Sequence, residues 1–263
     1  MTHEARRHID QLPLAIMFDV DGCLISTGGA GMRSWRSAFD RLHGIPADIG
    51  QFTEAGMTDP EVGRLTFVRV LGRQPTDREM ARLLAVYLER LVEEVEQSPG
   101  YRIMPGVEAL LPRLTDAGVL LGIVSGGVEA AVHIKLGRGR LNHFFSVGGY
   151  GSDSTDRGEL TRLAIERCGR IHGHPLLPEQ VLVVGDTPRD IDAAHAASAI
   201  GVGVATGKYT VDALWAAGAD YVVPTLETPL PGVKGGPAPK PEGTVVREKA
   251  SVKNSLPVKK TPT

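Results

Sequence analysis

The chain has 263 residues, enough for one large domain or two modest ones, and its 42% hydrophobic content is typical of a globular protein. A net charge of −2 argues against a nucleic-acid partner, and Cys23 and Cys168 form neither a disulfide framework nor a metal-binding pair. No stretch approaches the length of a membrane span and the first residues lack the apolar core of a secretory signal, so we expect a cytoplasmic protein without a membrane partner.

The first predicted element is a buried strand in the segment LAIMFDVDG, residues 14–22. The strand ends in Asp19 and Asp21, followed by Gly22, where the backbone can turn and direct both carboxylates into one pocket. Two neighbouring carboxylates repel each other unless they share a cation or a proton, or have different roles. Taken alone, the pattern is explained equally well by a surface turn, because Asp and Gly are common turn residues.

Residues 30–97 have apolar positions at helical spacing, which predicts helices over 31–44, 59–72 and 76–97. Glycine or proline separates these segments. We therefore expect an inserted all-helical domain over residues 26–102, and a core domain formed by residues 1–25 and 103–227.

From Pro105 onward, short apolar runs alternate with helical segments. Strands near 119–127, 144–149, 180–186, 199–207 and 219–224 alternate with helices, which predicts an α/β fold with a parallel sheet and right-handed crossovers. After residue 227 the composition shifts to Pro, Gly and Lys, and we predict that residues 228–263 form a disordered tail.

Polar residues follow three of the predicted strands. Asp19 and Asp21 follow the first, Ser125 and Gly126 follow LGIV, and Asp186 follows VLVVG. In an open parallel sheet, ligands bind beyond the carboxyl ends of the strands. These residues are therefore predicted to converge on one site, although loops are polar in any case.

These segments resemble the motifs of the haloacid dehalogenase superfamily of hydrolases, in the phosphoglycolate phosphatase-like branch. FDVDGCLI is similar to the first motif, IVSGG to the second and VVGDTPRDI to the fourth, in the family's order, and the resemblance covers residues 14–223. It implies a Rossmann-like parallel sheet core with an inserted helical cap domain.

The resemblance also implies roles for individual residues. Asp19 matches the nucleophile that forms an aspartyl phosphate, and Asp21 matches the acid and base that serves the leaving alcohol and the attacking water. One Mg²⁺ ion would be held by the Asp19 carboxylate, the Asp21 carbonyl and Asp186. Ser125 would hydrogen-bond the phosphoryl group, assisted by backbone N–H groups around Gly22 and Gly126.

The third motif of the family supplies a cation, usually lysine, near the start of the helix before the fourth motif. Here GSDSTDRGEL offers Arg157 and no lysine, and a guanidinium suits phosphate recognition. Lys135 competes for this role, but it lies within a predicted helix, where we expect it on a solvated face. Asp190 matches the residue that orients the cation and supports the metal, whereas Asp192 is expected to be solvated.

Substrate choice is expected to lie in the cap. The segment GMTDPEV, residues 56–62, stands where related proteins place a loop facing the active site, so Thr58 and Asp59 are candidate substrate-binding residues. The same residues also fit a plain helix start with Pro60 in the first turn. Residues 28–31, GGAG, are a candidate hinge.

The sequence thus predicts a Mg²⁺-dependent phosphatase that hydrolyses a small phosphorylated metabolite, in a monomer or small homo-oligomer. The alternatives are phosphoglucomutase-like phosphoryl transfer and a non-catalytic phosphoprotein-binding relative. The first lysine of the chain is Lys135, so the cap lacks the amine needed to cleave carbon–phosphorus bonds or to support a mutase. Asp21 also distinguishes the chain from dehalogenases, which lack this aspartate.

Overall fold

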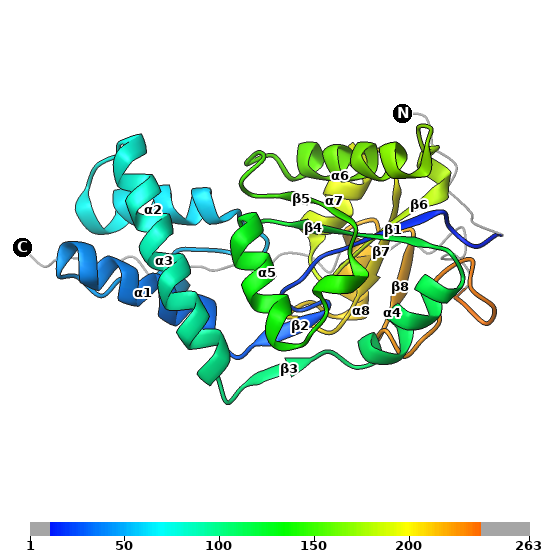
Figure 1. The fold of residues 1–263 in the computed structure, drawn as a ribbon, viewed down its shortest axis with the longest axis horizontal. Helices are drawn as coiled ribbons and strands as arrows, with labels where there is room; N and C mark the ends of the chain where they lie inside the picture. The colour runs from blue at the N-terminus through cyan, green and yellow to red at the C-terminus, as the bar shows by residue number, and fades with distance from the viewer. Residues whose placement is uncertain (1–10, 238–263) are drawn as a thin grey trace, which may run out of the picture.

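A six-stranded parallel sheet forms the centre of the protein. The computed structural model describes residues 11–237, and in it the strands lie in the order β5-β4-β1-β6-β7-β8 (Figure 1). The sheet strands are β1 (Ala15–Phe18), β4 (Leu120–Ser125), β5 (Val147–Tyr150), β6 (Val181–Gly185), β7 (Ile200–Val204) and β8 (Tyr221–Val223). Strand β1 is therefore flanked by β4 and β6, with Phe18 opposite both Ile123 and Val184. The predicted parallel α/β fold is confirmed.

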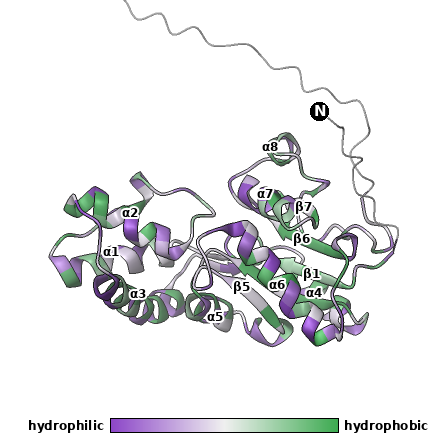
Figure 2. Ribbon diagram, turned by 90° about the horizontal axis from the view of Figure 1, so that it is seen from above, coloured by the Kyte–Doolittle hydropathy of each residue, from purple (hydrophilic) through white to green (hydrophobic). Residues whose placement is uncertain are grey.

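Helices cover both faces of the sheet because the strand residues alternate between two apolar surfaces. Ile16 and Phe18 face the layer that contains α4 and α5, whereas Ala15 and Met17 face the layer that contains α6 and α7. The helices of the core are α4 (Val107–Asp116), α5 (Glu129–Arg138), α6 (Arg157–His172), α7 (Pro188–Ala196) and α8 (Val211–Ala216). In Figure 2, strands β1 and β6 are coloured mostly toward the hydrophobic end of the scale.

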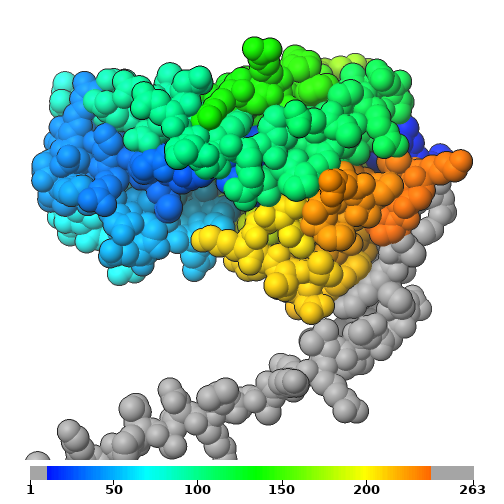
Figure 3. Space-filling view, turned by 90° about the horizontal axis from the view of Figure 1, so that it is seen from below, coloured from blue at the N-terminus to red at the C-terminus, as the bar shows by residue number. Residues whose placement is uncertain are grey.

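Three helices inserted after β1 pack together at one end of the molecule (Figures 1 and 3). They are α1 (Ala30–His43), α2 (Asp59–Leu71) and α3 (Asp77–Gln97). Capping boxes at Thr58 and Thr76 begin α2 and α3, since each threonine pairs with a glutamate three residues later. The interior of this helical cluster contains Trp35 stacked on Tyr87, and it extends onto α5 through Ala131. The three helices predicted between residues 31 and 97 are confirmed.

Two short strands join the helical cluster to the sheet. Strands β2 (Ile25–Thr27) and β3 (Tyr101–Ile103) pair antiparallel, and the sequence pattern did not reveal them. Beside them Gly28 has φ 60°, and a Cβ atom there would lie 2.5 Å from the backbone of Gly100. The two crossing segments are thus in direct backbone contact, as a compact connection between cap and core requires.

The beginning of the predicted disordered tail differs from the structure. Leu230 is fully buried in the core layer beneath the sheet, and Val233 packs against the same layer. Because apolar residues are isolated in this Pro- and Gly-rich segment, the sequence pattern did not indicate that Leu230 packs against the core. Residues 1–10 of the predicted core and 238–263 of the predicted tail lie outside the described residues. Among residues 11–237, no helix combines the length and apolar character needed to cross a bilayer.

Candidate active site

Several predicted site residues gather where three adjacent strands end. Asp19 follows β1 and its N–H donates to the carbonyl of Val184, which aligns the ends of β1 and β6. Ser125 is the last residue of β4, and Asp186 follows β6 directly. Because β4, β1 and β6 are neighbours, the strand order alone brings these residues together.

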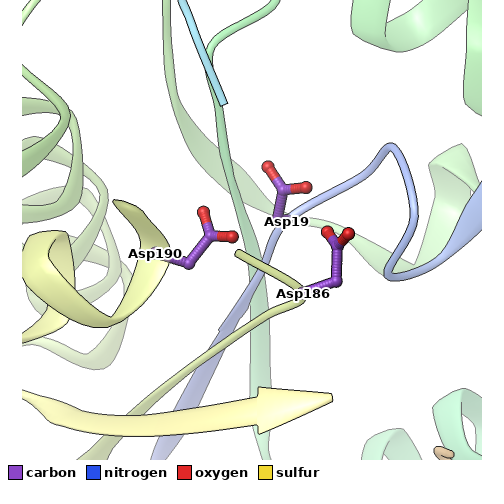
Figure 4. A group of neighbouring side chains, drawn as sticks. All are labelled: Asp19, Asp186 and Asp190. Atoms are coloured by element: carbon purple, nitrogen blue, oxygen red, sulfur yellow. The ribbon is translucent and has the colours of Figure 1, made fainter. Parts of the chain in front are cut away.

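Three buried carboxylates form an acidic cluster, shown in Figure 4. Asp19, Asp186 and Asp190 each place an oxygen within 4.8 Å of the others. Burial, followed by the charge of Asp190, raises the pKa of Asp19 well above its usual value and raises that of Asp186 to about 7. Carboxylates held this close require positive charge to remain ionised.

The donor set fits a small divalent cation. Asp186 Oδ1 is buried and has no hydrogen-bond partner, whereas Asp190 is fully engaged: its Oδ2 accepts from the N–H and hydroxyl of Thr187 at 3.0 and 2.8 Å. Asp19 and Asp186 are therefore available as oxygen ligands, and Asp190 is held in a supporting position.

Arg157 connects the nucleophile candidate to Asp190. It is the first residue of α6, and its Nη2 atom donates to Asp190 Oδ1 and lies 3.3 Å from Asp19 Oδ1. The side chain is only 9% exposed. Although burial opposes its charge, Asp190 and Asp19 raise the pKa of Arg157 above its ordinary value. A permanent cation thus stands beside Asp19.

Lys135 is buried, and the expectation of a solvated face is wrong. Its Nζ atom donates to Asp21 Oδ2 at 2.5 Å, and the residue is only 6% exposed. Burial opposes the charge, but the carboxylates of Asp21 and Asp59 and the Tyr87 phenol raise the pKa of Lys135 above its usual value. Each of the two competing cations therefore contacts a different aspartate of the first motif.

Thr58 and Asp59 begin helix α2 and face different partners. The Thr58 hydroxyl donates to Glu61 at 2.9 Å and Thr58 is completely buried, so it serves the helix start. Asp59 Oδ2 accepts the N–H of Val128 at 2.8 Å and also a hydrogen bond from Tyr87. Asp59 thereby links the helical cluster to the segment after β4.

Glycines make room for these contacts. Gly22 has φ 93°, and a Cβ atom there would lie 2.4 Å from Asp186 Oδ2. At Gly126 a Cβ atom would lie 2.5 Å from the Met57 carbonyl. Ser125 is buried beside it and its hydroxyl accepts the N–H of Gly127 at 3.2 Å. The backbone of the first two motifs therefore packs closely against the metal-ligand candidate and the cap.

A cavity of about 250 Å³ opens between the helical cluster and the strand ends. It is bounded on the core side by Asp19, Asp21, Ser125, Lys135 and Arg157, and on the cap side by residues that include Trp35, Met57, Asp59 and Tyr87. Two larger hollows of about 610 Å³ each lie elsewhere and contain none of these residues. The predicted site residues other than Gly22, Thr58, Asp186 and Asp190 thus line one cavity. These four are not among its lining residues.

Sequence reasoning missed several residues of the site. The Thr206 hydroxyl donates to the Gly22 carbonyl at 2.6 Å, and a Cβ atom at Gly207 would lie 1.7 Å from Asp186 Oδ2. Both follow β7 in VATGKY, so the strand-end rule could have found them. Tyr87 gave no such signal, because its position in an amphipathic helix indicates only a core residue. Cys23 is buried and its thiol faces the Val184 carbonyl.

Comparison with known proteins agrees with this site. The family of haloacid dehalogenase-like hydrolases matches residues 13–198. A phosphoglycolate phosphatase of Salmonella choleraesuis is 26% identical over 239 residues, covering 83% of this chain and 91% of its own length. The phosphoglycolate phosphatase of Synechococcus elongatus is 28% identical over 215 residues, covering 82% and 93%.

Solved structures share the fold at lower identity. CbbY from Rhodobacter sphaeroides, solved in complex with phosphate, superposes with a TM-score of 0.68 at 22% identity, covering 85% of this chain and 99% of that one. The β-phosphoglucomutase of Clostridium difficile superposes with a TM-score of 0.65 at 18% identity, covering 83% and 94%. With the family match spanning both the strand-end carboxylates and the inserted helices, this chain belongs to the haloacid dehalogenase-like hydrolases.

Proposed function

We propose that this hydrolase is a Mg²⁺-dependent phosphatase acting on a small phosphate monoester. The observation that carries the proposal is the buried group formed by Asp19, Asp186, Asp190 and Arg157 at the end of β1. Phosphoryl transfer depends on positioning and on neutralising charge, and this group places a carboxylate nucleophile beside a fixed cation.

In the first step, a carboxylate oxygen of Asp19 attacks phosphorus and the ester P–O bond breaks. Asp21 gives its proton to the departing alkoxide, which leaves as the alcohol, and Asp19 carries the phosphoryl group as an acyl phosphate. In the second step, Asp21 takes a proton from water, whose oxygen attacks phosphorus. The P–O bond to Asp19 breaks, so inorganic phosphate leaves and the Asp19 carboxylate is regenerated.

The other residues position and neutralise the phosphoryl group. Arg157 fills the role of the third-motif cation, since it is the cation that contacts Asp19. The Ser125 hydroxyl and the N–H groups near Gly22 and Gly126 bind phosphoryl oxygens. Asp19, Asp186 and the Asp21 carbonyl would hold Mg²⁺, which reduces the repulsion between the carboxylate and the anionic substrate.

Phosphate release from an activated aryl phosphate tests the proposal. Asp19→Asn should remove measurable turnover and leave the fold intact, because the side chain stands at a strand end outside the apolar core. The matched control is Asp192→Asn, which removes a solvent-exposed carboxylate from α7 and should retain turnover. Activity close to wild type in folded Asp19→Asn, or full activity of the wild-type protein in excess chelator, would contradict the proposal.

Hydrolysis is favoured over intramolecular transfer by the composition of the cap. Helices α1–α3 contain no lysine, and the hinge segment STGGAG contains no histidine to serve a sugar hydroxyl. A hexose phosphate incubated with the enzyme should therefore yield inorganic phosphate without isomerised sugar phosphate.

A further inference from the structure

Both cations that line the active-site cavity are already bound by carboxylates. Arg157 is shared between Asp19 and Asp190, and Lys135 contacts Asp21. Within residues 11–237, the lining of this cavity includes no third lysine, arginine or histidine. A second anionic group on a substrate would therefore have to compete for a cation that is already paired.

Lys135 is the cation placed for contact with a leaving group, because Asp21 is the proposed proton donor to that group. Its amine is already paired with Asp21, and the Asp59 carboxyl group lines the same cavity. Asp59 is fixed there by Val128 N–H and Tyr87. The cap thus places a carboxyl group, and no compensating cation, beside the space where the leaving alcohol must lie.

The remaining cap surface of the cavity supplies no basic side chain among the described residues. Trp35, Val62 and Met57 line it, and Glu54 at its edge is paired with Arg189 at 3.1 Å. Five carboxyl groups, those of Asp19, Asp21, Asp59, Asp186 and Asp190, surround or support the site against two cations. Even with one divalent ion bound, the arrival of a phosphate dianion leaves an excess of negative charge.

We propose that this site selects phosphate monoesters whose leaving alcohol carries no negative charge, because Lys135 is already paired with Asp21 and the Asp59 carboxyl group lines the same cavity. The inference rests on the proposed phosphatase activity and names its substrate class. It separates this chain from relatives named for phosphoglycolate, a substrate whose leaving group bears a carboxylate. A carboxylate is normally bound by a free arginine or lysine, and none faces this end of the cavity.

A matched pair of substrates tests the proposal directly. Phosphoglycolate and its primary amide have the same number of heavy atoms and the same ester linkage, and they differ by one negative charge on the leaving group. At neutral pH with Mg²⁺, kcat/KM for the amide should exceed that for phosphoglycolate by roughly tenfold or more. The reason is that the amide lacks the unit negative charge that phosphoglycolate would bring to within several ångströms of the carboxylates of the site. Equal values, or a preference for phosphoglycolate, would overturn the proposal.

Asp59→Asn tests the role of the cap carboxylate. Asparagine keeps an acceptor for the Val128 N–H and removes the charge, so the amide-to-phosphoglycolate ratio should fall severalfold toward unity. Asp77→Asn is the control, because Asp77 begins α3 on the exposed surface of the same cap and does not line the cavity. An unchanged ratio in folded Asp59→Asn, or an equal change in Asp77→Asn, would overturn the assignment to Asp59.

An aryl phosphate measured in parallel distinguishes failure of the proposed substrate class from failure of the proposed phosphatase function. Absence of phosphate release from every ester, the aryl phosphate included, would mean that the proposed phosphatase function fails. Release from the aryl phosphate with a preference for phosphoglycolate would leave that function standing and refute the substrate class. The wild-type substrate ratio requires no variant, so it remains informative even if Asp59→Asn does not fold.

Discussion

The Asp186 carboxyl makes the stability of the metal-free protein depend on pH. It is 4% exposed, its Oδ1 atom has no hydrogen-bond partner, and burial together with Asp190 raises its pKa from an ordinary 3.8 to about 7. Between these two values the folded state binds this proton and the unfolded state does not. The free energy of unfolding should therefore fall as pH rises from about 4 to about 7, by up to about 4 kcal/mol from this group.

Replacing Asp186 with asparagine removes the titrating group and keeps its size. Metal-free Asp186→Asn should be more stable than wild type by a few kcal/mol at pH 8, and this advantage should disappear toward pH 4. Mg²⁺ should stabilise the wild type, by about 2.7 kcal/mol at a concentration one hundred times its Kd, and more at pH 8 than at pH 5 because the ligands must be ionised. The variant should lose most of this response.

Urea unfolding at pH 5, 6, 7 and 8, in chelator and in Mg²⁺, measures both effects without reference to activity. Asp192→Asn, which lacks an exposed carboxylate on the same helix as Asp190, should follow the wild-type pH profile. A metal-free wild-type stability that changes with pH in parallel with that of Asp186→Asn would refute the reasoning. So would equal stabilisation of both proteins by Mg²⁺.

Three further predictions concern Asp21, Lys135 and the buried Leu230. Asp21→Asn should reduce kcat/KM far more for alkyl phosphates than for activated aryl phosphates, because good leaving groups need little protonation; equal losses for both would argue against an acid role. Lys135→Met should lower turnover by roughly ten- to a hundredfold through misplacement of Asp21, whereas exposed Lys208→Met should not. Steady-state kinetics measure both variants, and unchanged kcat and KM in Lys135→Met would refute a role of Lys135 in positioning Asp21. Leu230→Ala should cost about 2–5 kcal/mol in urea unfolding because Leu230 is fully buried, whereas the same change at exposed Leu177 should cost well under 1 kcal/mol; similar small losses would mean that residue 230 does not pack.

Local sequence patterns were sufficient to predict the sheet, the helices and the approach of the strand-end residues. The reason is that β1, β4 and β6 are short apolar runs followed at once by polar residues, and parallel strands place such residues at one edge. The short β2–β3 pair was missed because three-residue strands carry too few alternations to distinguish them from loops.

The position of Lys135 was mispredicted because residue type was given more weight than periodicity. Helix α5 buries Ala131, Val132, Lys135 and Leu136, which share one helical face, so the spacing already placed the lysine on the inner stripe. A lysine on that stripe requires an acidic partner. That partner, Asp21, lies 114 residues away in sequence, and no local pattern can identify such a contact.

A hydrogen bond between Asp59 and Val128 joins the start of α2 to the segment after β4. The Asp59 carboxyl group accepts the N–H of Val128, and the Asp59 N–H donates to the Gly126 carbonyl at 2.8 Å. Gly126 permits this approach, since a Cβ atom there would meet the Met57 carbonyl. The contacts that hold the start of α2 against the segment after β4 therefore also place the Asp59 carboxyl group in the cavity wall. We therefore expect the start of α2 to influence which charges a leaving group meets in this cavity.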